Sequence, residues 1–136
     1  MTVAFVLGGG GQLGAHEVGM LRALLERGIA PDLVVGTSVG AINGAAVASD
    51  PSVAAVGRLG ELWAELEQRD VFAGSLLRRL GTLARTGTHL HANDALRATL
   101  TEGLPIARIE DLPVRFECVA ASIEAAAEHW FTSGSL

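Results

Sequence analysis

The sequence of 136 residues contains no lysine, no tyrosine and a single cysteine, and its aromatic residues are four phenylalanines and two tryptophans. All ten basic residues are therefore arginines, and the net charge is −5. No basic stripe with interleaved aromatic residues is visible, which argues against a nucleic-acid partner. Cys118 cannot form an internal disulfide, which favours a reducing compartment. Because 49% of the residues are hydrophobic but few are aromatic, we expect an aliphatic, close-packed core.

Long apolar runs are also missing. None approaches the roughly 20 residues that a membrane-spanning helix needs. The apolar run at residues 3–7 has no basic segment before it and passes directly into glycines, which indicates a strand and not a signal peptide. We therefore expect one domain, a cytoplasmic location and, as a further expectation, peripheral contact with a membrane.

The first third of the chain has the pattern of a strand, a helix and a second strand. Residues 3–7 are continuously apolar, as in a parallel strand that is buried on both faces. Apolar residues then recur at helical spacing from Ala15 onward, and Gly28 fits the end of that helix. Residues 33–35 form a second short apolar run, at the right distance for a right-handed βαβ crossover.

After the second predicted strand, the sequence predicts mainly helices, followed by two further strands. A helix of small residues follows Ser38, and a longer one is predicted to begin with Asp50 as its cap and Pro51 at its first position. Further along, the sequence predicts a glycine-broken apolar segment, a helix capped by Asn93 and two more strands, at residues 71–90, 94–102, 114–121 and 130–132. This order predicts an α/β fold with a mainly parallel sheet.

Residues 36–40 read Gly-Thr-Ser-Val-Gly, a G-x-S-x-G pattern directly after the second predicted strand. Gly36 and Gly40 remove the Cβ atoms that would clash in a tight strand-to-helix turn. Ser38 is then exposed at the tip of that turn, above a helix N-terminus. This arrangement predicts a nucleophile elbow.

A second glycine cluster follows the first predicted strand. Gly9, Gly10, Gly11 and Gly14 could place backbone N–H groups around a developing oxyanion. Residues 9–14 also satisfy G-x-G-x-x-G, the dinucleotide-binding fingerprint. That fold needs an acidic residue at the end of the second strand, where this chain has Thr37 and Ser38, so nucleotide binding is the less favoured alternative.

Together, the two glycine motifs at this spacing resemble those of the patatin-like phospholipases, specifically the compact bacterial members. The family's G-G-G-x-R-G loop is matched by residues 9–14, its nucleophile elbow by residues 36–44, and a strand lead-in by residues 109–120. The resemblance implies a three-layer α/β/α fold and a serine lipid acyl hydrolase of the phospholipase A, lysophospholipase or esterase type. It implies a Ser–Asp dyad with Ser38 as nucleophile, an acyl-lipid substrate, and no metal or cofactor.

The chain departs from that family at two points. The family's catalytic aspartate is followed by glycine, and none of the five aspartates here has a glycine after it: Asp32, Asp50, Asp70, Asp94, Asp111. The resemblance therefore predicts that residues 1–136 are the N-terminal part of a single, truncated domain, with the base outside the chain. The chain alone is then expected to be inactive. Leu13 stands where the family usually has arginine, which removes a charge near the loop.

The histidines leave other interpretations of the site open. His129 follows Asp94 and Asp111, in the chain order of an α/β-hydrolase triad, although a solvent-facing histidine in a strand is the favoured interpretation. His89 and His91 have a spacing that could bind a metal, but no carboxylate or cysteine pattern supports it. An acyltransferase would use the same elbow with a histidine partner.

Two further alternatives concern lipids and partners. The apolar segment at residues 71–90, with Arg78 and Arg79, could face lipid as a lid, although packing on the sheet is favoured. The alternative to an enzyme is a non-catalytic lipid- or protein-binding module of the same fold. The open sheet edge predicts pairing with the C-terminal remainder of the protein or self-association into a homo-oligomer.

Overall fold

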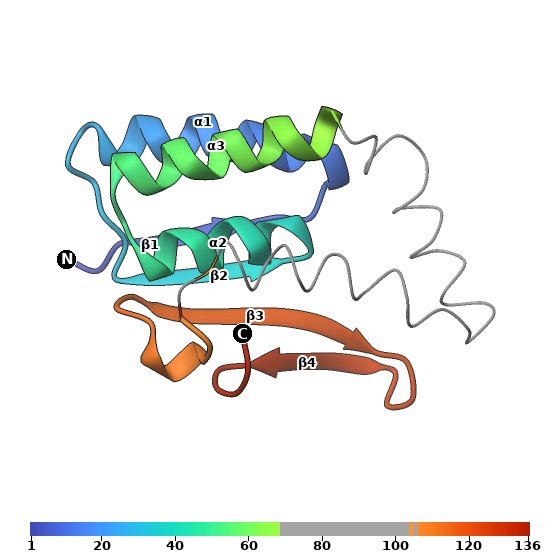
Figure 1. The fold of residues 1–136 in the computed structure, drawn as a ribbon. Coiled ribbons are helices and arrows are strands. Elements are labelled where there is room, and N and C mark those ends of the chain that lie inside the picture. Colours follow the sequence, from blue (N-terminus) through green and yellow to red (C-terminus); the bar gives the residue numbers. More distant parts are fainter. Residues whose placement is uncertain (69–103, 105) are drawn as a thin grey trace.

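The computed structural model describes residues 1–68, 104 and 106–136 of the chain (Figure 1). These residues form a sheet of four strands in the order β1-β2-β3-β4. The strands are β1 (Ala4–Leu7), β2 (Leu33–Thr37), β3 (Arg115–Ser122) and β4 (Ala127–Phe131). The first three strands are parallel and β4 is antiparallel to β3, which confirms a mainly parallel α/β fold.

Helices cover one face of this sheet. They are α1 (Gly14–Leu25), α2 (Val39–Ser49) and α3 (Val53–Gln68), with short 3-10 turns η1 (Gly11–Leu13) and η2 (Ile109–Asp111). α2 lies directly on the strands, and α1 and α3 pack side by side against α2 and each other (Figure 1). The described helices thus supply one helical side of the predicted three-layer fold. The segments predicted at 71–90 and 94–102 lie outside the described residues.

The ends of the helices follow local sequence rules, with one correction. After α1, Gly28 adopts φ 72°, and its N–H and that of Ile29 donate to the carbonyls of Leu25 and Leu24 in a Schellman arrangement, as predicted for a C-terminal glycine. The prediction that Asp50 caps the next helix is wrong, because the chain stays non-helical through residue 52. The Ser52 hydroxyl instead accepts the Ala55 N–H at 3.1 Å.

Asp50 has a different role in the structure. Its carboxylate accepts a hydrogen bond from Arg58 at 2.8 Å, one turn into α3. A hydrogen bond from Ser52 and the nearby Arg58 charge lower the pKa of Asp50 below its ordinary value. The carboxylate therefore remains ionised beside the start of α3, where the helix dipole also favours negative charge.

The sheet has one buried face and one open face in the part of the chain that the structure describes. Phe5, Val34 and Phe116 form a buried row under α2, with exposed fractions of 6%, 0% and 3%. The expectation that the first strand is buried on both faces is wrong, because Val6 is 76% exposed. A continuous apolar run does not reveal which neighbouring layers cover it, and β1 alternates between buried and exposed residues.

The fourth strand begins earlier than predicted. It spans Ala127–Phe131, whereas the sequence predicted residues 130–132. A tight turn joins it to β3: Ala126 adopts φ 48°, and its N–H donates to the Ile123 carbonyl. The turn is rich in alanine and contains neither glycine nor proline, the residues that usually indicate a turn. The sequence therefore contains no signal for the start of the strand.

We propose that the open face of the sheet is covered in solution, and we expect the isolated 136-residue chain to self-associate. Val6 lies on the open face beside half-buried Val35, and Trp130 of β4, which is 44% exposed and pairs with Val119, lies on the same face. Apolar area of this kind is costly in water. Sedimentation velocity should give a mass above the monomer's 14.1 kDa.

A pair of charge substitutions tests this expectation. Val6→Glu places a charge on the open face and should shift the chain toward monomer. Val53→Glu is the matched control, because Val53 is 37% exposed at the start of α3, on the helical side of the sheet. A monodisperse, cooperatively melting wild-type monomer would show that the chain closes its own core and would contradict the proposal.

Candidate active site

Ser38 lies at a sharp turn between β2 and α2. It is exposed and adopts φ 54° and ψ −126°, one of two non-glycine residues with positive φ in the described part of the chain. Positive φ is unfavourable for a residue with a side chain, so surrounding structure must hold it. The turn lifts the side chain out of the strand and places it at the N-terminus of α2.

The two glycines of the G-x-S-x-G pattern hold this turn together. A Cβ on Gly36 would lie 2.5 Å from the Gly40 carbonyl oxygen and 2.6 Å from the Ala41 Cα. A Cβ on Gly40 would lie 2.5 Å from the Gly8 carbonyl oxygen and would also overlap the Leu7 backbone. The start of α2 therefore touches the backbone at the end of β1, which only glycine permits.

The glycine loop at residues 9–14 lies beside the serine. A Cβ on Gly9 would be 3.3 Å from the Ser38 Cβ and 3.9 Å from its Oγ. Gly11 adopts φ 58°, which turns the chain into η1, and the Leu13 N–H donates to the Gly10 carbonyl at 3.1 Å. Among the described residues, the N–H groups of Gly9, Gly10 and Gly11 donate to no backbone acceptor. No described backbone carbonyl therefore occupies these three N–H groups.

Gly14 differs from the other loop glycines. Its N–H is directed to the Gln12 and Gly11 carbonyls at the end of η1. A Cβ at this position would lie 2.8 Å from Val39 Cγ2 and 2.9 Å from Trp63 Cζ2. Gly14 thus allows α1 to begin in close contact with the first residue of α2.

A buried polar network lies under this loop, and sequence reasoning missed it. Asn43 is 0% exposed, and its Nδ2 donates to the Gly14 carbonyl at 2.9 Å and to Glu17 Oε2 at 2.8 Å. The Trp63 Nε1 donates to the Asn43 Oδ1 at 2.9 Å. A polar residue in the middle of a helix of small and apolar residues was the available signal, but its three partners come from distant parts of the chain.

The described aspartates do not supply a base for Ser38. The carboxylate of Asp32 accepts the Val3 N–H at 2.7 Å, at the start of the strands, and Asp50 pairs with Arg58. Asp111 is exposed in η2. Within the described ranges no side chain forms a hydrogen bond with the Ser38 hydroxyl. Asp70 and Asp94 lie outside them.

The described histidines are placed away from a triad. His129 is exposed on β4, its ring packs edge-on against Phe131 at 4.5 Å, and β4 is two strands, or roughly 10 Å, from β2. The His16 Nδ1 lies 3.1 Å from the Leu13 carbonyl at the end of the glycine loop. His89 and His91 lie outside the described residues, and the described ones contain no group of three metal-binding side chains.

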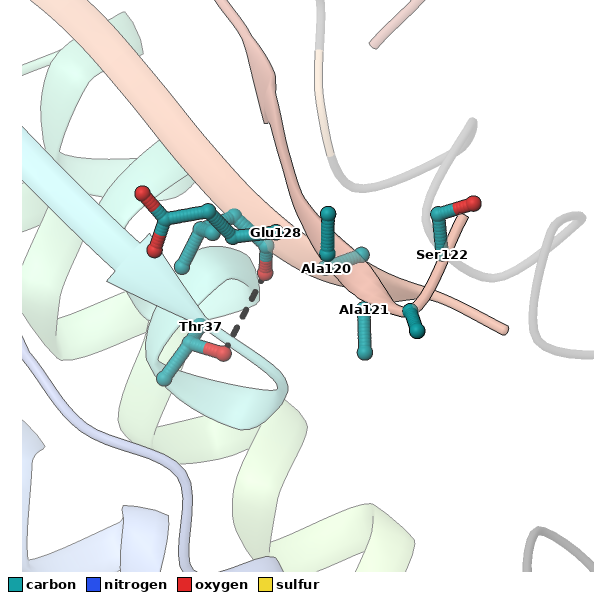
Figure 2. A pocket seen from close by; sticks show the side chains of 8 residues that line it. Thr37, Ala120, Ala121, Ser122 and Glu128 are labelled. Carbon is teal, nitrogen blue, oxygen red and sulfur yellow. Dashed lines mark hydrogen bonds between the residues drawn. The ribbon is translucent and has the colours of Figure 1, made fainter. Parts of the chain in front are cut away.

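An open pocket of about 450 Å³ lies beside Thr37, the residue that precedes Ser38. Figure 2 shows Thr37 with Glu128 near it, and Ala120, Ala121 and Ser122 of the β3–β4 hairpin further along the pocket. The Thr37 hydroxyl donates to the Val119 carbonyl at 3.2 Å and so joins the end of β2 to β3. Most of the lining side chains are alanine or valine, which gives the pocket an apolar wall near the elbow.

Cys118 is half-buried against the core, and burial raises the pKa of its thiol above the ordinary value. As far as the structure describes the chain, its helices are too short or too polar to cross a membrane.

The sequence comparisons agree with this geometry. A family model described as "Patatin-like phospholipase" matches residues 5–134. The chain belongs to the patatin-like phospholipase family. The family match includes both the glycine loop and the G-x-S-x-G turn, and it confirms the family that the motifs predicted.

Three relatives illustrate how similar the chain is to known proteins. The chain is 33% identical over 135 residues to "Patatin-like phospholipase domain-containing protein 7" of Rattus norvegicus, and 33% identical to "Patatin-like phospholipase domain-containing protein 6" of Homo sapiens. It is 30% identical to "Neuropathy target esterase sws" of Drosophila sechellia. Each match covers 99% of this chain but only 9–10% of the relative. These three relatives are animal proteins, so the compact bacterial type stays a prediction.

Proposed function

We propose that the protein is a serine acyl hydrolase that cleaves fatty-acyl esters of lipids, with Ser38 as its nucleophile. The observation that supports this best is the exposed serine at positive φ beside three backbone N–H groups without backbone partners. The names of the relatives, which are phospholipase and esterase, support an acyl-lipid substrate. The proposed reaction needs no metal or cofactor.

In the proposed reaction, Ser38 Oγ attacks the carbonyl carbon of the ester, and the carbonyl oxygen becomes an oxyanion. The N–H groups of Gly9, Gly10 and Gly11 stabilise that charge, helped by the N-terminus of α2. The tetrahedral intermediate collapses, the alcohol leaves with a proton, and an acyl-serine remains. Water then attacks the acyl-serine and releases the fatty acid, which restores the Ser38 hydroxyl.

The proton of Ser38 requires a base, and we propose an aspartate that is not among Asp32, Asp50 and Asp111. These three carboxylates form no hydrogen bond with the serine. A positioned base contributes roughly 10²–10⁴-fold to such reactions. The resemblance to the family places this aspartate in an Asp-Gly motif, which residues 1–136 do not contain, so we expect the 136-residue chain on its own to hydrolyse esters slowly.

The substrate class is tested by incubating the complete gene product with vesicles of phosphatidylcholine. The expected products are free fatty acid and lysophospholipid, identified by mass spectrometry. Release of phosphocholine or of phosphatidic acid would place the cleavage at a phosphodiester bond and contradict an acyl hydrolase. If the 136-residue chain alone is as fast as the complete protein, the base lies within these residues.

A non-catalytic lipid-binding module is the second proposal, favoured because no carboxylate among the described residues contacts Ser38. It predicts that the complete gene product sediments with vesicles but releases no fatty acid. It also predicts that Ser38→Ala binds those vesicles as the wild type does. Hydrolysis by the wild type would exclude this alternative.

A further inference from the structure

The Asn43 side chain is completely buried (0% exposed). The other buried residues of its helix, α2, are glycine, alanine and valine. Burying an amide costs free energy unless each of its polar atoms finds a partner. Here the amide does find partners, because its nitrogen makes two hydrogen bonds and its oxygen accepts one. An apolar residue of the same size could fill the space but could not make these bonds, so the bonds themselves need an explanation.

The hydrogen bond to Gly14 connects the two halves of the proposed site. Gly14 ends the glycine loop and begins α1, while Asn43 lies one helical turn after Val39, the residue that follows Ser38. Residues four apart lie on the same face of a helix, so Val39 and Asn43 both face Gly14. Val39 makes the close apolar contact there, and Asn43 donates to the Gly14 carbonyl at 2.9 Å.

The opposite end of the loop is also fixed to α2. Gly40 touches the backbone of Leu7 and Gly8, where β1 passes into the loop. The loop is therefore held against the helix of the nucleophile at both ends, by backbone contact at Gly8 and by the Asn43 amide at Gly14. Only the second attachment depends on a side chain.

We propose that Asn43 is a positioning residue for acyl transfer, which fixes the glycine loop at the distance from Ser38 where its N–H groups meet the oxyanion. The proposal rests on the hydrolase function proposed above. Asn43 touches no substrate and acts through the Gly14 carbonyl. A displacement of about 1 Å in such a site can lower the rate by about 10²-fold.

Asn43→Asp tests the role with little change in shape. In its ionised form the new carboxylate cannot donate to the Gly14 carbonyl, and it faces Glu17, whose carboxylate accepts from Asn43 at 2.8 Å in the wild type. We expect kcat for p-nitrophenyl butyrate at pH 8 to fall roughly 10–100-fold, a smaller effect than removal of an oxyanion donor. We expect KM to change less than about twofold, because the substrate-binding surface is untouched.

A double variant separates an effect on the position of the glycine loop from an effect on the stability of the fold. In Asn43→Asp/Glu17→Gln, the new amide can donate to the new carboxylate, which restores the bond to α1 but not the bond to Gly14. We expect the melting temperature to recover toward the wild type while kcat stays low. Glu17→Gln alone is the control, because its amide oxygen can still accept from Asn43, and its kcat should match the wild type.

The outcomes distinguish this inference from the proposed function. Wild-type hydrolysis with an unchanged kcat in Asn43→Asp overturns the positioning role and leaves the hydrolase intact. Recovery of both kcat and melting temperature in the double variant also overturns it, because Asn43 would then act only through stability. A wild-type complete protein that hydrolyses no ester overturns the proposed function, and this inference with it.

Discussion

Replacing Ser38 with alanine is expected to lower kcat for acyl-ester hydrolysis by the complete protein at least about 10³-fold, since loss of a serine nucleophile removes the covalent step. The melting temperature should not fall, because the exposed hydroxyl forms no hydrogen bond with any described residue. Alanine also keeps the Cβ that contacts Gly9. Fatty-acid release and thermal unfolding, measured on the same preparation, check both expectations.

Ser49→Ala is the matched control for this substitution. Ser49 ends the same helix, is half-buried, and its hydroxyl donates to the Ala45 carbonyl at 2.8 Å. The same chemical change at that end of α2 should leave kcat within about twofold, since it touches none of the proposed catalytic groups. A Ser38→Ala enzyme with wild-type kcat would show that another residue is the nucleophile.

Replacing Gly40 with alanine is expected to destabilise the fold by at least about 3 kcal/mol, the upper range for an added methyl group in a packed core. The methyl group would meet the backbone of Leu7 and Gly8, which cannot move aside as a flexible side chain can. The strand β1 and the helix α2 would have to separate, and the elbow would move away from the loop. The unfolding midpoint and the yield of soluble protein measure the effect.

Gly57→Ala is the matched control in α3. A Cβ on Gly57 meets no atom within 4 Å, and the residue is exposed. The same added methyl group should therefore stabilise the helix by about 0.5–1 kcal/mol, the difference in helix propensity between the two residues. A Gly40→Ala protein as stable as the wild type would contradict the close contact between the elbow and the end of β1.

The elbow could be predicted because its chemistry is local. Gly36, Ser38 and Gly40 lie within five residues, and the contacts that require glycine at position 36 come from the same turn of backbone, whereas those at position 40 come from the end of β1. The βαβ crossover was predicted for the same reason, since α1 ends where the N–H groups of Gly28 and Ile29 bond to the carbonyls of Leu25 and Leu24, all within six residues. Local patterns of this kind determine secondary structure and much of the site.

Other features depend on residues far apart in the chain, so the sequence could not reveal them. The exposure of Val6 depends on what covers the sheet, and the partners of Asn43 come from α1 and α3. The start of α3 was misplaced for a smaller reason. Asp50 and Ser52 are both good caps two residues apart, and the structure uses Ser52.

Reaction with a fluorophosphonate probe tests the central claim most directly, because such probes label a serine that is activated as a nucleophile. After incubation of the complete protein with the probe, peptide mass spectrometry should find one phosphonylated residue, Ser38. Ser38→Ala should remain unlabelled, and Ser49→Ala should be labelled at the wild-type rate. A wild-type protein that stays unlabelled, or one labelled at another serine, would contradict the account of Ser38 as an activated nucleophile.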